Sequence, residues 1–340
     1  MRQAKTLMVQ GTASTVGKST LVTGLCRIFA QDGWRVAPFK AQNMALNSFV
    51  TRDGGEIGRA QAVQAEAAGV EPTVEMNPIL LKPEGMSRSQ VIVLGRPLEA
   101  IEARHYYRHR SSLFEVVRQA LARLREEYDL VLIEGAGSPV ELNLAEYDLV
   151  NMPVARLAGA PVLLLGDIDR GGIFASLLGT LMLLRPEDRA RVKGLVVNKF
   201  RGDLSLWRSG EQLLAERSGI PVFGTVPFYN DIHIAEEDSV ALDDGTAPMM
   251  RHTHQGQNDH LLEVVVVRLP FLSALPHQNL PRSVPFRLSL PGYCWRCHQV
   301  RSVLITSGQT TPQPLYSRQK DESREASGRK ESCRMRSLVA

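Results

Sequence analysis

The sequence is poor in cysteine and aromatic residues and has no long apolar run. Four unevenly spaced cysteines in 340 residues exclude a disulfide scaffold, and aromatic residues make up only 6% of the chain. No segment approaches the roughly 18 consecutive apolar residues of a membrane span, and residues 1–11 enter a strand-like segment without a cleavage site. We therefore expect a cytoplasmic globular protein with no membrane partner.

The net charge of +4 is concentrated near the C-terminus. Residues 271–340 carry 11 Lys and Arg against 4 Asp and Glu, whereas residues 1–270 carry 29 against 32, a net charge of −3. The basic part has neither a helical period nor interleaved aromatic residues, so it is not typical of a nucleic-acid surface. We expect no nucleic-acid partner.

Cys294, Cys297 and His298 have the spacing of a c-type haem attachment site. That attachment takes place on exported chains, and the N-terminus indicates no export. A zinc ion would need a fourth ligand, whereas only these three residues cluster. The sequence therefore favours neither haem nor zinc.

Short apolar runs alternate with helix-like segments through residue 230. The runs do not alternate in polarity, which is typical of strands that are buried on both faces of a parallel sheet. They occupy residues 6–10, 35–39, 130–133, 161–166, 194–198 and 221–226, and helices are expected at 18–31, 57–68, 112–127 and 173–184. This order predicts an α/β fold with a doubly wound, mostly parallel sheet of the P-loop NTPase type, whose ligands bind at the carboxyl ends of the strands.

The composition changes after about residue 240. We expect one domain over residues 1–240 and a polar, turn-rich linker over residues 241–260. Residues 261–272 then begin with one strong apolar strand. Residues 273–340 contain scattered prolines and a low-complexity basic end, which predicts an irregular, disordered tail.

The segment from Gly11 to Thr20 predicts a phosphate-binding loop between the first strand and the first helix. Gly17 would let backbone amides approach phosphate oxygens, Lys18 would place a positive charge at the β/γ bridge, and Ser19 would offer a hydroxyl to Mg²⁺. The motif departs from the general pattern, because Thr12 replaces its first glycine. The expected ATP-binding residues of the loop are Gly11, Thr12, Ser14, Thr15, Val16, Gly17, Lys18, Ser19 and Thr20.

Charged and polar side chains at other strand ends extend this site. Glu134 ends an apolar strand and Asp53 lies in a glycine-flanked turn, so both are candidate Mg²⁺ ligands beside Ser19. Lys40 ends the second strand, where it could face the transferring phosphoryl group, and Asn198 could bind the adenine edge. For all four residues, a solvated side chain at the end of a strand or in a turn is the alternative.

Eight segments resemble the cobyric acid synthases, the glutamine-dependent amidases of cobalamin synthesis. They follow one another in order from about residue 4 to about residue 270, which is more specific than a phosphate loop alone. The segments are GTASTVGKST, PFKAQNMALNS, DGGEIGRAQAVQAEAAG, NPILLKP, LIEGAGSPVELNL, LLGDIDRGGIFASLLGT, VVNKFRGD and PVFGTVPF.

This resemblance implies an ATP-dependent ligase that amidates the b, d, e and g carboxylates of adenosylcobyrinic acid a,c-diamide. The nucleotide domain is similar to dethiobiotin synthetase, which implies catalytic roles for Lys18 and Lys40 and a Mg²⁺ site at Ser19, Asp53 and Glu134. Substrate-facing or phosphate-facing positions implied by the family segments are Asn43, Asn47, Asp169 and Arg170.

The family takes ammonia from a C-terminal glutaminase domain with a Cys nucleophile. Residues 261–272 resemble the first strand of that domain, and the likeness then stops. Cys294 and Cys297 do not lie in a strand, nucleophile and helix pattern, so we expect ammonia rather than glutamine to be the donor for this chain.

Three alternatives remain open from the sequence. A partitioning or positioning ATPase of the ParA and MinD type would carry a lysine early in the loop, where this chain has Ala13. Dethiobiotin synthetase and the a,c-diamide synthase share the superfamily, but the QNMALNS and DIDRGG segments argue against both. The third alternative is a remnant that binds ATP without turnover.

Overall fold

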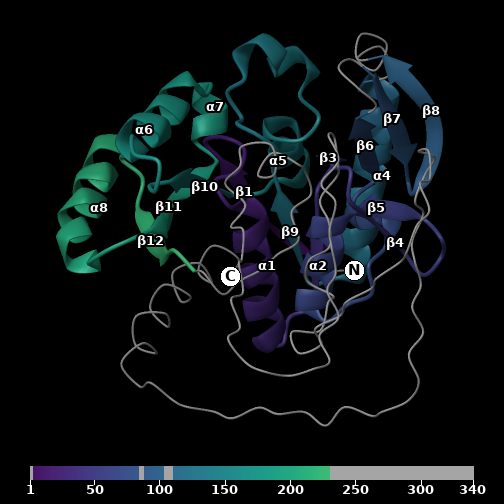
Figure 1. Ribbon diagram of the computed structural model, residues 1–340, viewed down its shortest axis with the longest axis horizontal. Coiled ribbons are helices and arrows are strands. Elements are labelled where there is room, and N and C mark those ends of the chain that lie inside the picture. Colours follow the sequence, from purple (N-terminus) through teal and green to yellow (C-terminus); the bar gives the residue numbers. More distant parts are fainter. Residues whose placement is uncertain (1–2, 84–87, 103–109, 230–340) are drawn as a thin grey trace, which may run out of the picture.

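A computed structural model describes residues 3–83, 88–102 and 110–229 of the chain. Its centre is a parallel sheet of six strands in the order β12-β11-β10-β1-β9-β2 (Figure 1). The sheet confirms the predicted fold class and all six predicted strands. Their bounds are β1 Lys5–Gly11, β2 Val36–Phe39, β9 Leu130–Glu134, β10 Val162–Asp167, β11 Val192–Phe200 and β12 Val222–Pro227.

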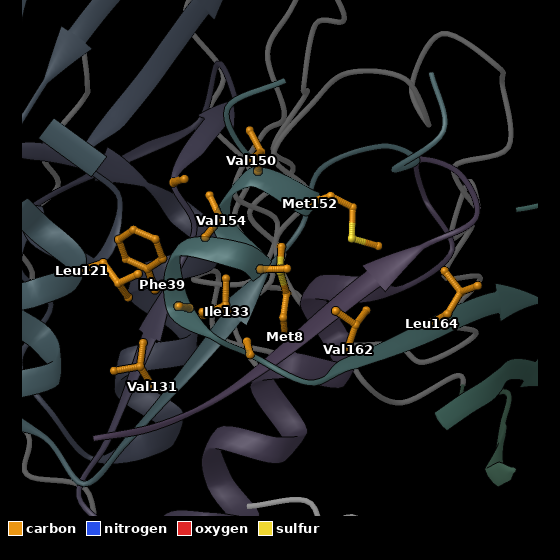
Figure 2. Packing of buried hydrophobic residues seen from close by; sticks show 14 of the residues in the cluster. Met8, Phe39, Leu121, Val131, Ile133, Val150, Met152, Val154, Val162 and Leu164 are labelled. Atoms are coloured by element: carbon orange, nitrogen blue, oxygen red, sulfur yellow. The ribbon is translucent and has the colours of Figure 1, made fainter. Parts of the chain in front are cut away.

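Helices cover both faces of this sheet because successive strand residues point to opposite sides. Leu7 and Val9 of β1 pack with α1 (Lys18–Gln31), whereas Met8 belongs to the core on the other face. Figure 2 shows Met8 close to Val154 of α5. The helices that follow α1 are α2 Arg59–Ala68, α4 Arg110–Glu127, α5 Met152–Ala158, α6 Ile173–Leu183, α7 Pro186–Arg189 and α8 Leu204–Ser218.

The first helix illustrates how the sequence determines a packed face. Val22, Leu25, Cys26 and Phe29 recur at the three-residue and four-residue spacing of a helix and are buried against the sheet. Its bounds match the prediction for residues 18–31. The helices predicted at 57–68, 112–127 and 173–184 are also present, with ends that differ by two residues or fewer.

A second sheet between residues 42 and 102 was not predicted. It has four strands in the order β3-β6-β7-β8, and it lies beside the central sheet at the upper right of Figure 1. A two-stranded hairpin of β4 and β5 precedes α2. The bounds are β3 Gln42–Met44, β4 Ser48–Val50, β5 Glu56–Gly58, β6 Ile79–Pro83, β7 Arg88–Val93 and β8 Arg96–Glu102, with the 3-10 helices η1 Val74–Met76 and η3 Leu142–Tyr147.

Two groups of expectations lie outside the described residues. The first group is the predicted C-terminal organisation, with a linker over 241–260, a strand over 261–272 and a tail over 273–340. The second is the cluster of Cys294, Cys297 and His298. These expectations therefore stay predictions. Within the part of the chain that the structure describes, no helix is both long and apolar enough to cross a membrane.

Removal of the Phe29 ring should destabilise the central domain. Phe29 is 1% exposed between α1 and the sheet, so Phe29→Ala should lower the free energy of unfolding by about 3–5 kcal/mol. Urea denaturation followed by circular dichroism measures this change. Leu206→Ala is the matched control, because Leu206 is 80% exposed on α8, and its effect should stay within about 0.5 kcal/mol. Equal losses in the two variants would contradict the packing described above.

Candidate nucleotide site

The loop between β1 and α1 has the backbone that a phosphate cradle requires. Gly17 has a φ of 97°, and a Cβ at this position would lie 2.2 Å from the Asn198 side-chain nitrogen. Thr15 also has a positive φ, of 59°. A Cβ on Gly11 would lie 2.5 Å from the Val16 side chain. Glycine is therefore needed at both ends of the turn, for backbone conformation and for close approach.

Lys18 points back over this loop. Its Nζ atom donates to the carbonyl of Ala13 at 2.8 Å and to the carbonyl of Gly137 at 3.1 Å. Burial lowers its pKa to about 8; the Glu134 carboxylate opposes this shift and the Lys40 ammonium adds to it. The amine thus lies where phosphate oxygens could replace carbonyl oxygens as its partners, and an anion there would offset the cost of its burial.

Side chains from β11 hold the loop from the opposite side. The Asn198 amide donates to the Val16 carbonyl at 2.8 Å, and Lys199 Nζ donates to the Thr15 carbonyl at 2.7 Å and to Asp167 at 2.8 Å. Asn198 was predicted to contact adenine, and contact with a base stays a prediction. The contact that the structure does give it is with the loop, which no sequence motif indicated.

Glu134 is the buried centre of the site. Ser19 donates from Oγ to its Oε1 atom at 2.8 Å, and Lys40 donates from Nζ to the same oxygen at 3.0 Å. The carboxylate is 0% exposed and Lys40 is 6% exposed. Burial raises the pKa of Glu134, but the Lys40 charge and hydrogen bonds from Gln64, Lys40 and Ser19 outweigh it, so the pKa lies below its usual value. Glu134 and Lys40 are therefore not the solvated side chains of the alternative interpretation.

Two glutamines of α2 bind the other oxygen of Glu134. Gln64 donates to Oε2 at 2.6 Å and Gln61 at 3.4 Å, and both side chains are fully buried. Asn43, which was predicted to face the substrate, is also buried and donates to Gln61 at 3.0 Å. Sequence reasoning missed both glutamines, since their three-residue spacing in RAQAVQAEAA looks like one polar stripe of a helix.

The loop after β9 connects this cluster to a cavity. The Asn151 side chain accepts from the amide of Ala136 at 3.1 Å and donates to its carbonyl at 2.8 Å, which holds residues 135–138 in place. A cavity of about 360 Å³ lies beside this loop, bordered by Gly137, by β3 and β7, and by the chain around α7. Gly137 is thus shared by the cavity and by the Lys18 contact.

Four other predicted residues lie in less buried positions. Asp53 is exposed in the turn between β4 and β5, and Asn47 is half-buried just before β4. Asp169 is exposed and accepts from Arg201 at 2.7 Å, and Arg170 is exposed beside it. No hydrogen bond or ion pair among the described residues joins any of these four to Lys18, Ser19 or Glu134. Their assigned roles stay predictions.

Comparisons with known proteins identify the family of the chain. Residues 7–241 match the family described as the CobQ/CobB/MinD/ParA nucleotide binding domain. The chain belongs to this family. It is 60% identical over 270 residues to a cobyric acid synthase of Sorangium cellulosum and 57% identical over 270 residues to one of Dehalococcoides mccartyi. Each alignment covers 79% of this chain but 51% and 52% of the respective relative, so the chain spans about half the length of the curated relatives it matches.

Solved structures resemble this family member more distantly. MinD cell division protein of Aquifex aeolicus is 13% identical with a TM-score of 0.37, and the match covers 67% of this chain and 84% of that chain. The signal recognition particle receptor FtsY of Elizabethkingia anophelis is 19% identical with a TM-score of 0.37, covering 65% and 56%. Neither likeness carries an argument about function. The resemblance to the cobyric acid synthases that the motifs indicated is confirmed by the sequence relatives.

Nucleotide affinity should fall as the pH rises through about 8. Because the pKa of Lys18 is about 8, the free protein loses this positive charge above that pH. In the nucleotide complex, the nearby phosphates would raise the pKa of Lys18 and keep its amine protonated. The ratio of wild-type to Lys18→Met affinity should therefore fall about tenfold between pH 7 and pH 9. Titration with a fluorescent ATP analogue measures both affinities, and their ratio cancels titration of the nucleotide itself. A ratio that does not change with pH would contradict this assignment.

The effects of substituting Glu134 and Lys40 on the free energy of unfolding should be coupled. Lys40→Met should lower the free energy of unfolding by about 3–5 kcal/mol at pH 7, because it removes the ammonium that is ion-paired with the buried carboxylate. Adding Glu134→Gln should recover most of this loss, since the amide carries no charge. Urea denaturation of both single variants and the double variant measures the coupling. Lys193→Met, at an exposed position of β11, is the control. Equal losses in Lys40→Met and in the double variant would exclude the coupling.

Proposed function

We propose that this chain is an ATP-dependent amide ligase of cobalamin synthesis that acts on the b, d, e and g carboxylates of adenosylcobyrinic acid a,c-diamide. The observation that carries the proposal is the arrangement of Ser19, Lys40 and Glu134 beside the phosphate loop, in a chain 60% identical over 270 residues to a cobyric acid synthase. ATP and the corrinoid are both substrates, and ammonia supplies the new nitrogen.

The reaction requires a phosphoryl transfer because a carboxylate has no good leaving group. A carboxylate oxygen of the substrate attacks the γ-phosphorus of ATP, the bond to the β-bridging oxygen breaks, and ADP leaves. Ammonia then attacks the carbonyl carbon of the acyl phosphate, phosphate leaves, and the nitrogen loses a proton to give the amide. No protein nucleophile is needed, so the chain contributes positioning and positive charge.

Lysine side chains and the loop amides would supply this positive charge and positioning. Lys18 would bind the β and γ phosphates at the position where it now contacts the Ala13 and Gly137 carbonyls. Lys40 would place a second positive charge near the transferring group. The loop amides between Gly11 and Gly17 would bind the remaining phosphate oxygens, as helix N-termini commonly do.

Ser19 and Glu134 suit a magnesium ion in their chemistry. The hydroxyl and the carboxylate are 2.8 Å apart, and both are hard oxygen ligands of the kind that Mg²⁺ prefers. The ion, when bound, would supply positive charge that offsets the negative charge of the phosphates. Gln61 and Gln64 hold the far carboxylate oxygen, which keeps Oε1 directed toward Ser19. Asp53 is a further proposed ligand, carried over from the family pattern.

The proposal is tested by amide formation with two nitrogen donors. The 340-residue chain with Mg-ATP and cobyrinic acid a,c-diamide should form amides from ammonium and not from glutamine, as followed by mass spectrometry. Lys18→Ala should reduce turnover by at least about a hundredfold, because it removes a charge aimed at the phosphates. Lys193→Ala, which changes an exposed lysine, should leave the rate unchanged.

The outcomes separate the competing explanations. Comparable rates with glutamine would overturn the assignment of ammonia as donor while leaving the ligase activity intact. Absence of product with either donor, together with normal ATP binding, would favour a remnant that binds nucleotide without turnover. Full activity in Lys18→Ala would remove the loop from the mechanism.

A further inference from the structure

A group of large apolar side chains surrounds the cavity next to the nucleotide site. Across the described residues, apolar side chains of this size are exposed at twelve positions, and five of these line this one cavity with exposures of 42–60%. Exposed apolar groups gathered around a concave surface indicate a binding site rather than ordinary surface. The five are Met44, Leu142, Leu144, Tyr147 and Leu183.

The cavity adjoins the phosphate loop, where the γ-phosphoryl group would be transferred. Gly137 lines it, and the Gly137 carbonyl is 3.1 Å from Lys18 Nζ. A Cβ placed on Gly137 would lie 3.9 Å from the Ser14 hydroxyl of the phosphate loop. A molecule in the cavity is therefore separated from the loop by one glycine. An acceptor of the γ-phosphoryl group must bind next to the phosphate loop, because the transfer requires contact between the reacting atoms.

Positive charge that could bind an acid in this cavity comes from Arg185, and Glu141 is an exposed acidic residue of the same lining. Asp188 is paired with Arg156 at 2.5 Å, and Asp148 accepts the backbone amides of Val150 and Asn151 at 2.8 and 3.0 Å. Arg185 also lines the cavity, and none of the side-chain hydrogen bonds or ion pairs between described residues involves its guanidinium. Arg185 is thus available to bind a carboxylate, which a guanidinium can do through two parallel hydrogen bonds.

We propose that this cavity is the acceptor site, and that it binds a large polycarboxylic acid by an apolar ring face while Arg185 binds one of its side-arm carboxylates. The inference rests on the proposed function, because the acceptor class is defined by that reaction. A volume of about 360 Å³ suits one edge of a ring-shaped molecule rather than the whole of it. The rest of the ring would lie over Leu142 and Leu144, which are exposed residues of the lining.

The binding partners come from separate parts of the fold. Met44 belongs to β3 of the second sheet and Leu144 to η3, whereas Leu183 ends α6 and Arg185 directly precedes α7 (Figure 1). The second sheet therefore supplies one wall of the acceptor site, whereas the central sheet supplies the phosphate loop. This division gives the unpredicted sheet a function in specificity.

The test measures corrinoid binding separately from nucleotide binding. Leu144→Asp and Arg185→Glu change exposed residues, so both variants should fold. Each should raise the dissociation constant for cobyrinic acid a,c-diamide at least about tenfold, which corresponds to 1.4 kcal/mol. Equilibrium dialysis of the full chain, read by the visible absorbance of the corrinoid, gives this constant. The affinity for a fluorescent ATP analogue should change less than twofold.

Two matched variants control for surface charge. Met182→Asp and Leu206→Asp introduce the same charge at residues that are 82% and 80% exposed and do not line the cavity. Both should bind the corrinoid within twofold of the wild type. Arg185→Lys should retain part of the affinity, because it keeps the charge and loses the paired hydrogen bonds.

Each other outcome overturns a distinct statement. If the wild type binds and amidates the corrinoid but Leu144→Asp and Arg185→Glu bind it equally well, the cavity assignment is wrong and the proposed function stands. If the wild type neither binds nor amidates the corrinoid, both proposals fail. If the lining variants change only the oligomeric state in sedimentation, the apolar group is a protein interface and the acceptor site lies elsewhere.

Discussion

The buried carboxylate of Glu134 is the constraint around which the candidate site is arranged. A carboxylate with no exposed surface is stable only when charges and hydrogen bonds replace water around it. Its partners come from three segments: Ser19 at the start of α1, Lys40 after β2, and Gln61 and Gln64 on α2. The same contacts fix the positions of these segments at the carboxyl edge of the sheet, where the phosphate loop lies.

Positive charge exceeds negative charge among the buried residues of this cluster. Two buried lysines, Lys18 and Lys40, face one buried carboxylate, and the lowered pKa of Lys18 reflects mainly its burial. An anion next to Lys18 would supply the missing negative charge. The Lys18 ammonium has carbonyl oxygens as its hydrogen-bond partners, and phosphate oxygens could replace them.

The parts of the fold that could be predicted from sequence are those with strong local signals. Leu130 to Ile133 form a continuous apolar run because both faces of β9 are buried, and Gly17 and Lys18 belong to a motif whose geometry is local. The second sheet gives weaker signals, since β3 has only three residues and pairs with β6 across a gap of more than thirty residues. Gln64 could not be assigned, because its partner Glu134 is seventy residues away and nothing in its own neighbourhood indicates it.

Close backbone approach explains why glycine occurs where the site meets its supports. A Cβ on Gly58 would lie 2.3 Å from the Asn43 side-chain nitrogen, and one on Gly135 would lie 2.5 Å from the Asn151 side-chain oxygen. In both places an asparagine amide occupies the space beside the glycine. Asn43 also contacts Gln61, and Asn151 holds the loop that contains Gly137. Gly17 and Asn198 repeat the arrangement at the phosphate loop. Three amides, each packed against a glycine, thus position the buried carboxylate of Glu134, the cavity wall and the loop between β1 and α1, and a larger residue at any of the three glycines would displace the segment that its asparagine holds.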